Sequence, residues 1–165
     1  MSKAPVMPPE ATPLEAFLNG QAVRAQEYLG AHPDQVDGQE GYRFRVWAPH
    51  AKAVGVMGDF NGWNQVGNLL DCVGGGVWEG FIPGLKQYDT YKYAIEARDG
   101  RMLAKSDPYA FHAETRPGNA SKLYDLSGYA WGDQSWLKYR KAHPVYHAPL
   151  NIYEVHLGSW KKRPN

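Results

Sequence analysis

Seven short segments with the alternating pattern of β-strands occupy the middle of this chain. In the first of them Tyr42, Phe44 and Val46 fall on one face, and arginine and tryptophan residues fall on the other. The segments span residues 42–47, 53–57, 69–73, 77–82, 90–97, 102–105 and 122–126. Because no helical pattern separates them, they predict a mainly β chain folded as an antiparallel β-sandwich.

The connections between these segments carry turn chemistry. Three glycines occupy residues 74–76, and they lack the lysine and the following serine or threonine of a phosphate-binding loop, so we interpret them as a turn. Asp99-Gly100 lies between residues 90–97 and 102–105. Since this pair tolerates positive φ at both positions, we expect a two-residue hairpin turn there.

Short helices are expected on both sides of the sandwich. Residues 12–15, Thr-Pro-Leu-Glu, combine a capping hydroxyl, proline at the first helical position and the glutamate of a capping box, and Asn19-Gly20 should end the helix. A second helical segment is expected at residues 22–29. Asp133 is placed to cap a third helix over residues 134–141.

These patterns divide the chain into three parts. Residues 1–30 form an N-terminal extension with short helices, and its first dozen residues are proline-rich and expected to be disordered. Residues 31–127 form the sandwich, and residues 128–165 form a linker helix followed by an apolar strand at 150–157. That strand resembles the first strand of a TIM-type barrel. A complete barrel needs about 250 residues, so we expect an orphan strand in a chain that binds but does not catalyse.

Composition excludes several classes of partner. The formal net charge is +1, and the only dense basic run is at residues 161–163, so neither nucleic acid nor an anionic membrane is an expected partner. Cys72 is the only cysteine, which rules out an internal disulfide. The N-terminal residues contain no apolar run of the kind found in signal peptides, so we expect a cytoplasmic protein.

The loop at residues 58–64, Gly-Asp-Phe-Asn-Gly-Trp-Asn, has the chemistry of a sugar-binding site. A neutral polysaccharide offers hydroxyl edges and apolar C–H faces, which a binder meets with a flat ring and with amide or ammonium groups. Trp63 supplies the ring, and Asn61, Asn64 and Lys92 supply the polar groups. In the alternative interpretation Trp63 closes one end of the sandwich and the amides only cap turns.

Several blocks occur in the same order as in a known family. They are Tyr42–Pro49, Val54–Trp63, Trp78-Glu79, Tyr91–Tyr93, Lys105–Ala110 and Ile152–Trp160. In this order they resemble the N-terminal region of a bacterial 1,4-α-glucan (glycogen) branching enzyme, an enzyme of glycogen biosynthesis. The resemblance extends from about Tyr28 to the end of the chain.

The resemblance implies a carbohydrate-binding module of family 48, the isoamylase N-terminal domain, which has an immunoglobulin-like β-sandwich. It is also similar to the glycogen-binding modules of the AMP-activated kinase β subunit. In those modules a tryptophan and a lysine contact the sugar, and these correspond to Trp63 and Lys92; a later asparagine of the modules falls near Asn119. The kinase module has a second stacking tryptophan where this chain has Arg101 and Met102, so one ring face is missing here.

The resemblance also implies the reaction of the parent family. Branching enzymes are glycosyltransferases of the α-amylase clan that move an α-1,4-glucan segment to an α-1,6 branch point by a retaining mechanism, with two carboxylates as in retaining glycosidases. Those carboxylates lie on later barrel strands. We assign no catalytic residue to this chain, because four of its glutamates fall in no matching motif: Glu79, Glu96, Glu114 and Glu154.

Two further clusters could carry chemistry. Glu154 and His156 lie two residues apart on the expected strand. They could act as an acid–base pair or serve packing and hydrogen bonding, and we favour the second interpretation. His143 and His147 have the spacing of metal ligands, but Pro144 prevents the helix that would direct both imidazoles to one point. We therefore expect no metal and no cofactor.

Two functions compete at this level. The favoured one is an α-glucan-binding and barrel-supporting region, with glucan and the catalytic barrel of the same polypeptide as partners. The alternative is a structural domain that docks the barrel without appreciable affinity for sugar. Its docking flank would include Tyr109, Phe111, Trp131 and Trp136.

Overall fold

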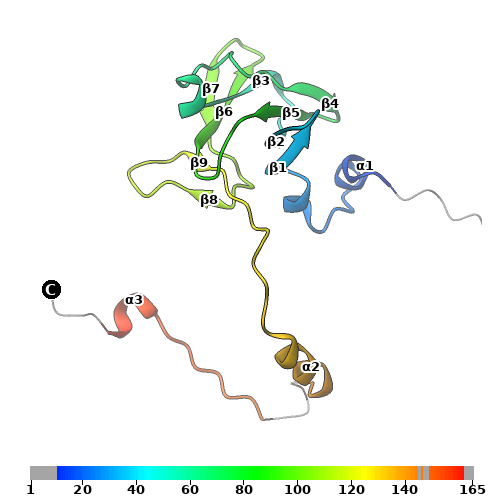
Figure 1. Cartoon of the computed structure of the whole chain (residues 1–165), viewed down its shortest axis with the longest axis vertical. Coiled ribbons are helices and arrows are strands. Elements are labelled where there is room, and N and C mark those ends of the chain that lie inside the picture. The colour runs from blue at the N-terminus through cyan, green and yellow to red at the C-terminus, as the bar shows by residue number, and fades with distance from the viewer. Residues whose placement is uncertain (1–10, 145, 147–148, 162–165) are drawn as a thin grey trace, which may run out of the picture. The chain divides into compact units, whose positions relative to one another are not determined.

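The computed structural model describes residues 11–144, 146 and 149–161, and it divides into two compact units (Figure 1). Residues Met1–Leu126 form the first unit, and residues Ser127–Asn165 form the second. All strands that the structure describes belong to the first unit. The prediction of a mainly β chain with antiparallel sheets is confirmed.

The first unit contains two antiparallel sheets. One has four strands in the order β1-β2-β5-β4. Its strands are β1 (Gly30–Val36), β2 (Gln39–Trp47), β5 (Val77–Pro83) and β4 (Asp71–Gly74). The other has the order β3-β6-β9-β8, with β7 also paired to β6. Its strands are β3 (Ala51–Gly58), β6 (Thr90–Ala97), β9 (Ser121–Lys122), β8 (His112–Ala113) and β7 (Met102–Lys105).

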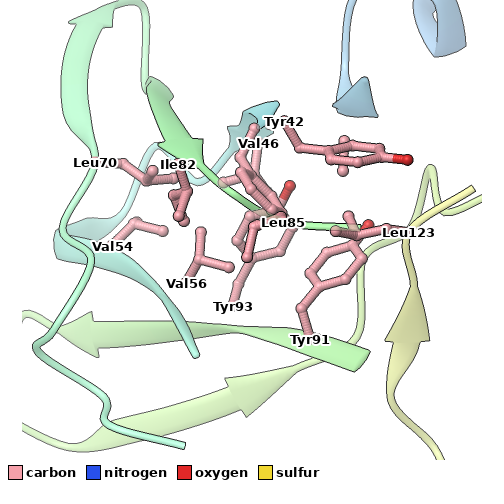
Figure 2. Close-up of a cluster of buried hydrophobic side chains, with 12 residues drawn as sticks. Tyr42, Val46, Val54, Val56, Leu70, Ile82, Leu85, Tyr91, Tyr93 and Leu123 are labelled. Atoms are coloured by element: carbon pink, nitrogen blue, oxygen red, sulfur yellow. The ribbon is translucent and has the colours of Figure 1, made fainter. Parts of the chain in front are cut away.

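The core lies between the two sheets, as Figure 2 shows for a cluster of buried side chains. Phe44 of β2 meets Tyr91 of β6 edge to face, with ring centroids 5.2 Å apart. Val54 and Val56 of β3 are fully buried beside them. Because alternate residues of each strand point inward, the intervening residues of β6, including Lys92, lie on the outer face of their sheet.

A buried carboxyl group ties one end of the core together. Asp107 accepts hydrogen bonds from the Tyr91 hydroxyl at 2.7 Å, from the Tyr93 hydroxyl at 3.3 Å and from the Tyr109 backbone N–H at 2.8 Å. Its own backbone N–H donates to the Ser121 hydroxyl at 2.9 Å. Burial raises the pKa of Asp107, and the hydrogen bonds from Tyr91, Tyr109 and Tyr93 oppose that shift.

The sequence patterns did not predict β1, whose residues fall largely in the segment assigned to the start of the sandwich. The strand contains Pro33 and polar residues, which weaken the alternation. Since β1 lies at the edge of its sheet, proline is tolerated there without loss of a ladder hydrogen bond in the sheet interior. Of the one or two helical turns expected within residues 22–29, the structure forms the single 3₁₀ turn η1 (Ala25–Glu27).

The first helix forms as predicted. Helix α1 (Pro13–Leu18) begins after Thr12, and the side chains of Thr12 and Glu15 complete a reciprocal capping box. The ring of Phe17 meets the Trp47 indole edge to face, with centroids 6.0 Å apart. This contact holds α1 against the end of β2.

Two turn and strand predictions need correction. Residues 98–101 separate β6 from β7, and a 2.9 Å hydrogen bond from the Ala97 N–H to the Arg101 carbonyl closes a three-residue loop over 98–100. Only Gly100 takes positive φ there, while the Asp99 side chain accepts from the Arg101 backbone N–H. The strand expected at residues 122–126 is limited to Ser121–Lys122, because β8 and β6 pair with it only there.

The second unit contains the predicted linker helix. Helix α2 (Gln134–Ala142) follows Asp133, but the Asp133 side chain makes no capping hydrogen bond, contrary to prediction. Residues 151–156 form no strand in the structure, since no described segment pairs with them, and Leu157–Trp160 form helix α3. The barrel strand therefore stays a prediction. Among the described residues, no helix has the length and apolar character needed to cross a membrane.

Candidate functional site

The loop that follows β3 presents Trp63 in an unusual backbone conformation. The 3₁₀ turn η2 (Asp59–Asn61) ends at Gly62, which has a φ of 61°. Trp63 also has a φ of 61°, a left-handed conformation that is a rare outlier for a bulky residue. A 2.9 Å hydrogen bond from the Trp63 backbone N–H to the Gly58 carbonyl closes the loop and holds it. Such local strain is concentrated at functional sites.

Asp59 fixes the direction of the indole ring. The Trp63 Nε1–H donates to Asp59 Oδ1 at 2.9 Å, and the Thr90 hydroxyl donates to the other oxygen of the same carboxylate. The loop is thereby tied to the first residue of β6. Trp63 remains 38% exposed, so its ring lies open at the surface rather than sealed in the core. The interpretation of Trp63 as a plug for the sandwich is not supported by this exposure.

Asn61 organises the loop from within. Its side-chain oxygen accepts from the Gly58 backbone N–H at 3.0 Å, and its side-chain nitrogen donates to the Val56 carbonyl at 3.0 Å and to Asn68 Oδ1 at 2.7 Å. Asn64 likewise accepts from the Val66 backbone N–H at 3.1 Å. In this structure both predicted amides are occupied by bonds that shape the loop.

Lys92 and Asn119 are brought together from distant parts of the sequence. The Lys92 ammonium donates a hydrogen bond to the Asn119 side-chain oxygen, and the Ser106 hydroxyl donates to the Asn119 carbonyl. Lys92 lies two residues after Thr90, so the two share the outer face of β6. A chain of contacts therefore leads from the Trp63 indole through Asp59 and Thr90 to this face.

Asp59 and Thr90 are the site residues that the sequence analysis missed. Alternation along β6 places Thr90 on the same face as Lys92, which is a signal that the sequence contains. No sequence pattern indicates the role of the Asp59 carboxylate, because that role depends on how the loop folds back. The arrangement offers an aromatic face bordered by ammonium, amide and hydroxyl groups, a chemistry suited to an uncharged polyhydroxylated ligand.

The glutamates of the sandwich serve structural contacts. Glu79 accepts from Arg43 at 2.9 Å and also from Arg45, and the Arg43 guanidinium bonds Asp34 as well, which lowers the pKa of Asp34. Glu96 makes a surface ion pair with a lysine, and Glu114 accepts a hydrogen bond from a backbone N–H.

The remaining candidates lie in the second unit. Glu154 and His156 are both exposed, and the His156 ring contacts the Ser159 hydroxyl at 2.8 Å. The His143 ring contacts the Tyr139 carbonyl at 3.0 Å, while His147 lies outside the described residues. These contacts are local and bring no acid–base pair together.

Comparison with known proteins identifies the family of the sandwich. Residues 28–110 match the family model of carbohydrate-binding module 48, described as the isoamylase N-terminal domain. The matched range includes Trp63, Asp59, Thr90 and Lys92, while Asn119 lies outside it.

Longer relatives match most of the chain. The chain is 44% identical over 155 residues to the 1,4-alpha-glucan branching enzyme GlgB of Bacillus subtilis (strain 168), an alignment that covers 93% of this chain and 25% of that protein. It is 47% identical over 147 residues to the GlgB of Thermosynechococcus vestitus (strain NIES-2133 / IAM M-273 / BP-1), covering 89% of this chain and 19% of that protein. The chain thus spans a quarter or less of the length of these curated relatives.

A solved structure with partial similarity is the Klebsiella pneumoniae pullulanase complexed with maltotriose. The TM-score is 0.47 at 24% sequence identity, and the match covers 67% of this chain and 11% of the pullulanase chain.

Proposed function

Because the chain belongs to the family of carbohydrate-binding module 48, the isoamylase N-terminal domain, we propose that its sandwich binds α-glucan on the face that presents Trp63 and Lys92. The ligand class is glycogen, amylopectin or a maltooligosaccharide. In this proposal the Trp63 ring stacks on the apolar face of a glucose unit, and Lys92 and Asn119 bind its hydroxyl groups. Asn61 positions the loop instead of contacting sugar directly.

The observation that carries this proposal is the immobilised and exposed indole. Trp63 is held in a strained backbone conformation and by the Asp59 carboxylate, yet it remains 38% exposed. A ring that is fixed before binding loses little conformational entropy when a ligand stacks on it. The contacts from Asp59 through Thr90 to the face of Lys92 support a single binding surface.

The expected affinity is weak. Stacking one glucose ring on Trp63 buries roughly 100 Å² of apolar surface, which at ~25 cal/mol/Å² contributes about 2.5 kcal/mol before the cost of association. Affinity for a short oligosaccharide should therefore be about millimolar. A branched polymer offers many chain ends, which raises the local concentration of ligand around this single site.

Trp63→Ala should abolish retention in native gels that contain glycogen. The matched control is Trp47→Ala, which also removes an exposed indole but at the end of β2, where Trp47 donates to the Gly75 carbonyl. The control variant should be retarded as strongly as the unmodified chain. Equal mobility of Trp63→Ala and Trp47→Ala in glycogen gels would remove the binding proposal.

We also propose that the chain acts as part of a branching enzyme, whose retaining transfer of an α-1,4-glucan segment is performed by a catalytic barrel. The similarity to GlgB proteins over most of this chain supports this assignment. The role of the module is then to hold glucan near the barrel and to support the barrel.

A docking role without sugar affinity is the second candidate, and one observation favours it. The unit Ser127–Asn165 exposes large apolar side chains, among them Trp131 at 72% and Trp136 at 56%. Exposed aromatic surface of this kind is typical of an interface. If glycogen gels show no retention and light scattering shows association that rises with concentration, docking is the function that remains.

A further inference from the structure

A second aromatic cluster lies on the sandwich, apart from Trp63. Tyr88 precedes β6, His112 lies on β8, and Tyr124 follows β9. The Tyr88 ring lies 5.7 Å from the His112 ring and 5.8 Å from the Tyr124 ring, and the His112 and Tyr124 rings lie 5.6 Å apart. All three centroid distances fall in the range of favourable aromatic contacts.

Tyr88 shares two features with Trp63. Its φ is 76°, so both exposed aromatic residues adopt the left-handed conformation that bulky side chains avoid. Tyr88 is 53% exposed, so burial of its ring does not account for this conformation. Its backbone N–H donates to the Leu123 carbonyl at 2.8 Å, and the Asp89 side chain accepts from the Lys86 backbone N–H at 2.8 Å. The ring is thus presented by a turn held at both ends.

The register places this cluster on the same outer face as Lys92. Leu123 is buried in the core, so its neighbours Lys122 and Tyr124 point outward. Thr90 and His112 both pair with Lys122, from β6 and β8 respectively, and residues directly opposite each other share a face. Thr90 contacts the Trp63 loop. The distance across the sheet from Thr90 to His112 is two strand spacings, about 10 Å.

We propose that Tyr88, His112 and Tyr124 form a second subsite for the same α-glucan chain. This inference rests on the proposed function of the Trp63 face and extends it across the sheet. The Tyr88 ring offers a stacking surface for a sugar ring, while the Tyr124 hydroxyl and the Lys122 ammonium offer groups for its hydroxyls.

The test is the dependence of affinity on oligosaccharide length, measured by NMR titration with maltotriose and with maltoheptaose. Tyr88→Gly is the informative variant, because glycine removes the ring and accepts a φ of 76° without strain. We expect it to weaken maltoheptaose binding about tenfold while leaving maltotriose binding at Trp63 unchanged. Tyr129→Ala, which removes a tyrosine that is 70% exposed, serves as the control and should bind both sugars normally.

The outcomes separate this subsite from the function on which it rests. If the unmodified chain and Tyr88→Gly bind maltoheptaose equally well while Trp63→Ala binds poorly, the subsite is overturned and the Trp63 site stands. If the unmodified chain binds neither sugar, both proposals fall. An amide chemical-shift map that shows the Tyr88→Gly fold intact excludes misfolding as the cause of a lost affinity.

Discussion

Replacing Asp107 with alanine is expected to lower the free energy of unfolding by about 3 kcal/mol. The substitution removes the acceptor of the Tyr91 hydroxyl, the Tyr93 hydroxyl and the Tyr109 backbone N–H. Tyr91 and Tyr93 are 1% and 0% exposed, so water cannot replace the lost bonds without entering the core. Urea unfolding followed by tryptophan fluorescence measures the effect. A loss below about 1 kcal/mol would contradict the assigned network.

Asp107→Asn keeps the shape of the side chain and removes its charge, so it tests the effect of the charge alone. Because burial raises the pKa of Asp107 above its ordinary value of 3.8, the folded protein binds a proton there more tightly than the unfolded chain. The stability that this proton contributes is fully present below pH 3.8 and is lost as the pH rises through the folded pKa. The unmodified chain should therefore gain stability relative to Asp107→Asn as the pH falls toward that value. A difference that is independent of pH would contradict a titrating carboxyl in the core.

The second large effect is expected for Gly58→Ala, with a loss of about 3 kcal/mol in the free energy of unfolding. Gly58 pairs with Tyr91 across β3 and β6, and an added Cβ would lie 2.1 Å from the Thr90 carbonyl oxygen and 2.5 Å from the Phe60 ring. Since the nearest atom belongs to the backbone, the strands must separate where Asp59 meets Thr90. Thermal unfolding measures the stability, and glycogen gels should show weaker retention at a temperature where the variant is folded.

Gly62→Ala is the matched control for this prediction. An added Cβ at Gly62 meets nothing within 4 Å, so only its φ of 61° opposes the substitution. The expected loss is about 1 kcal/mol, the cost of placing an L-residue in the left-handed region. If the two variants lose the same free energy of unfolding, close contact between the strands at Gly58 is not what makes glycine necessary there.

Much of the fold could be predicted because alternation is strong wherever one face of a strand is buried. Residues 42–47 and 90–97 lie close to the observed β2 and β6 for this reason. Edge strand β1 could not be predicted, since Pro33 and exposed polar residues remove the pattern that burial would impose. The hairpin after β6 was predicted one residue too short, because Asp-Gly also suits a three-residue loop in which only the glycine is left-handed.

The candidate site was only partly predictable. The sequence places Trp63 in a glycine-flanked loop and Lys92 on a strand, but the pairing of Lys92 with Asn119 depends on the return of the chain through β8 and β9. The role of Asp59 depends on a loop that folds back onto Thr90. Asn61 shows the converse: a side chain with the right chemistry for sugar is used for the loop itself.

The most direct test of the Trp63 platform is an NMR titration of the unmodified chain with maltoheptaose, followed through the indole N–H resonances of its 6 tryptophans. Loss of one resonance in Trp63→Phe assigns the signal that reports on the bond to Asp59. The Trp63 signal should move progressively with added sugar while the Trp47 signal stays in place. A Trp63 signal that is unmoved at concentrations well above millimolar would contradict α-glucan binding on this face.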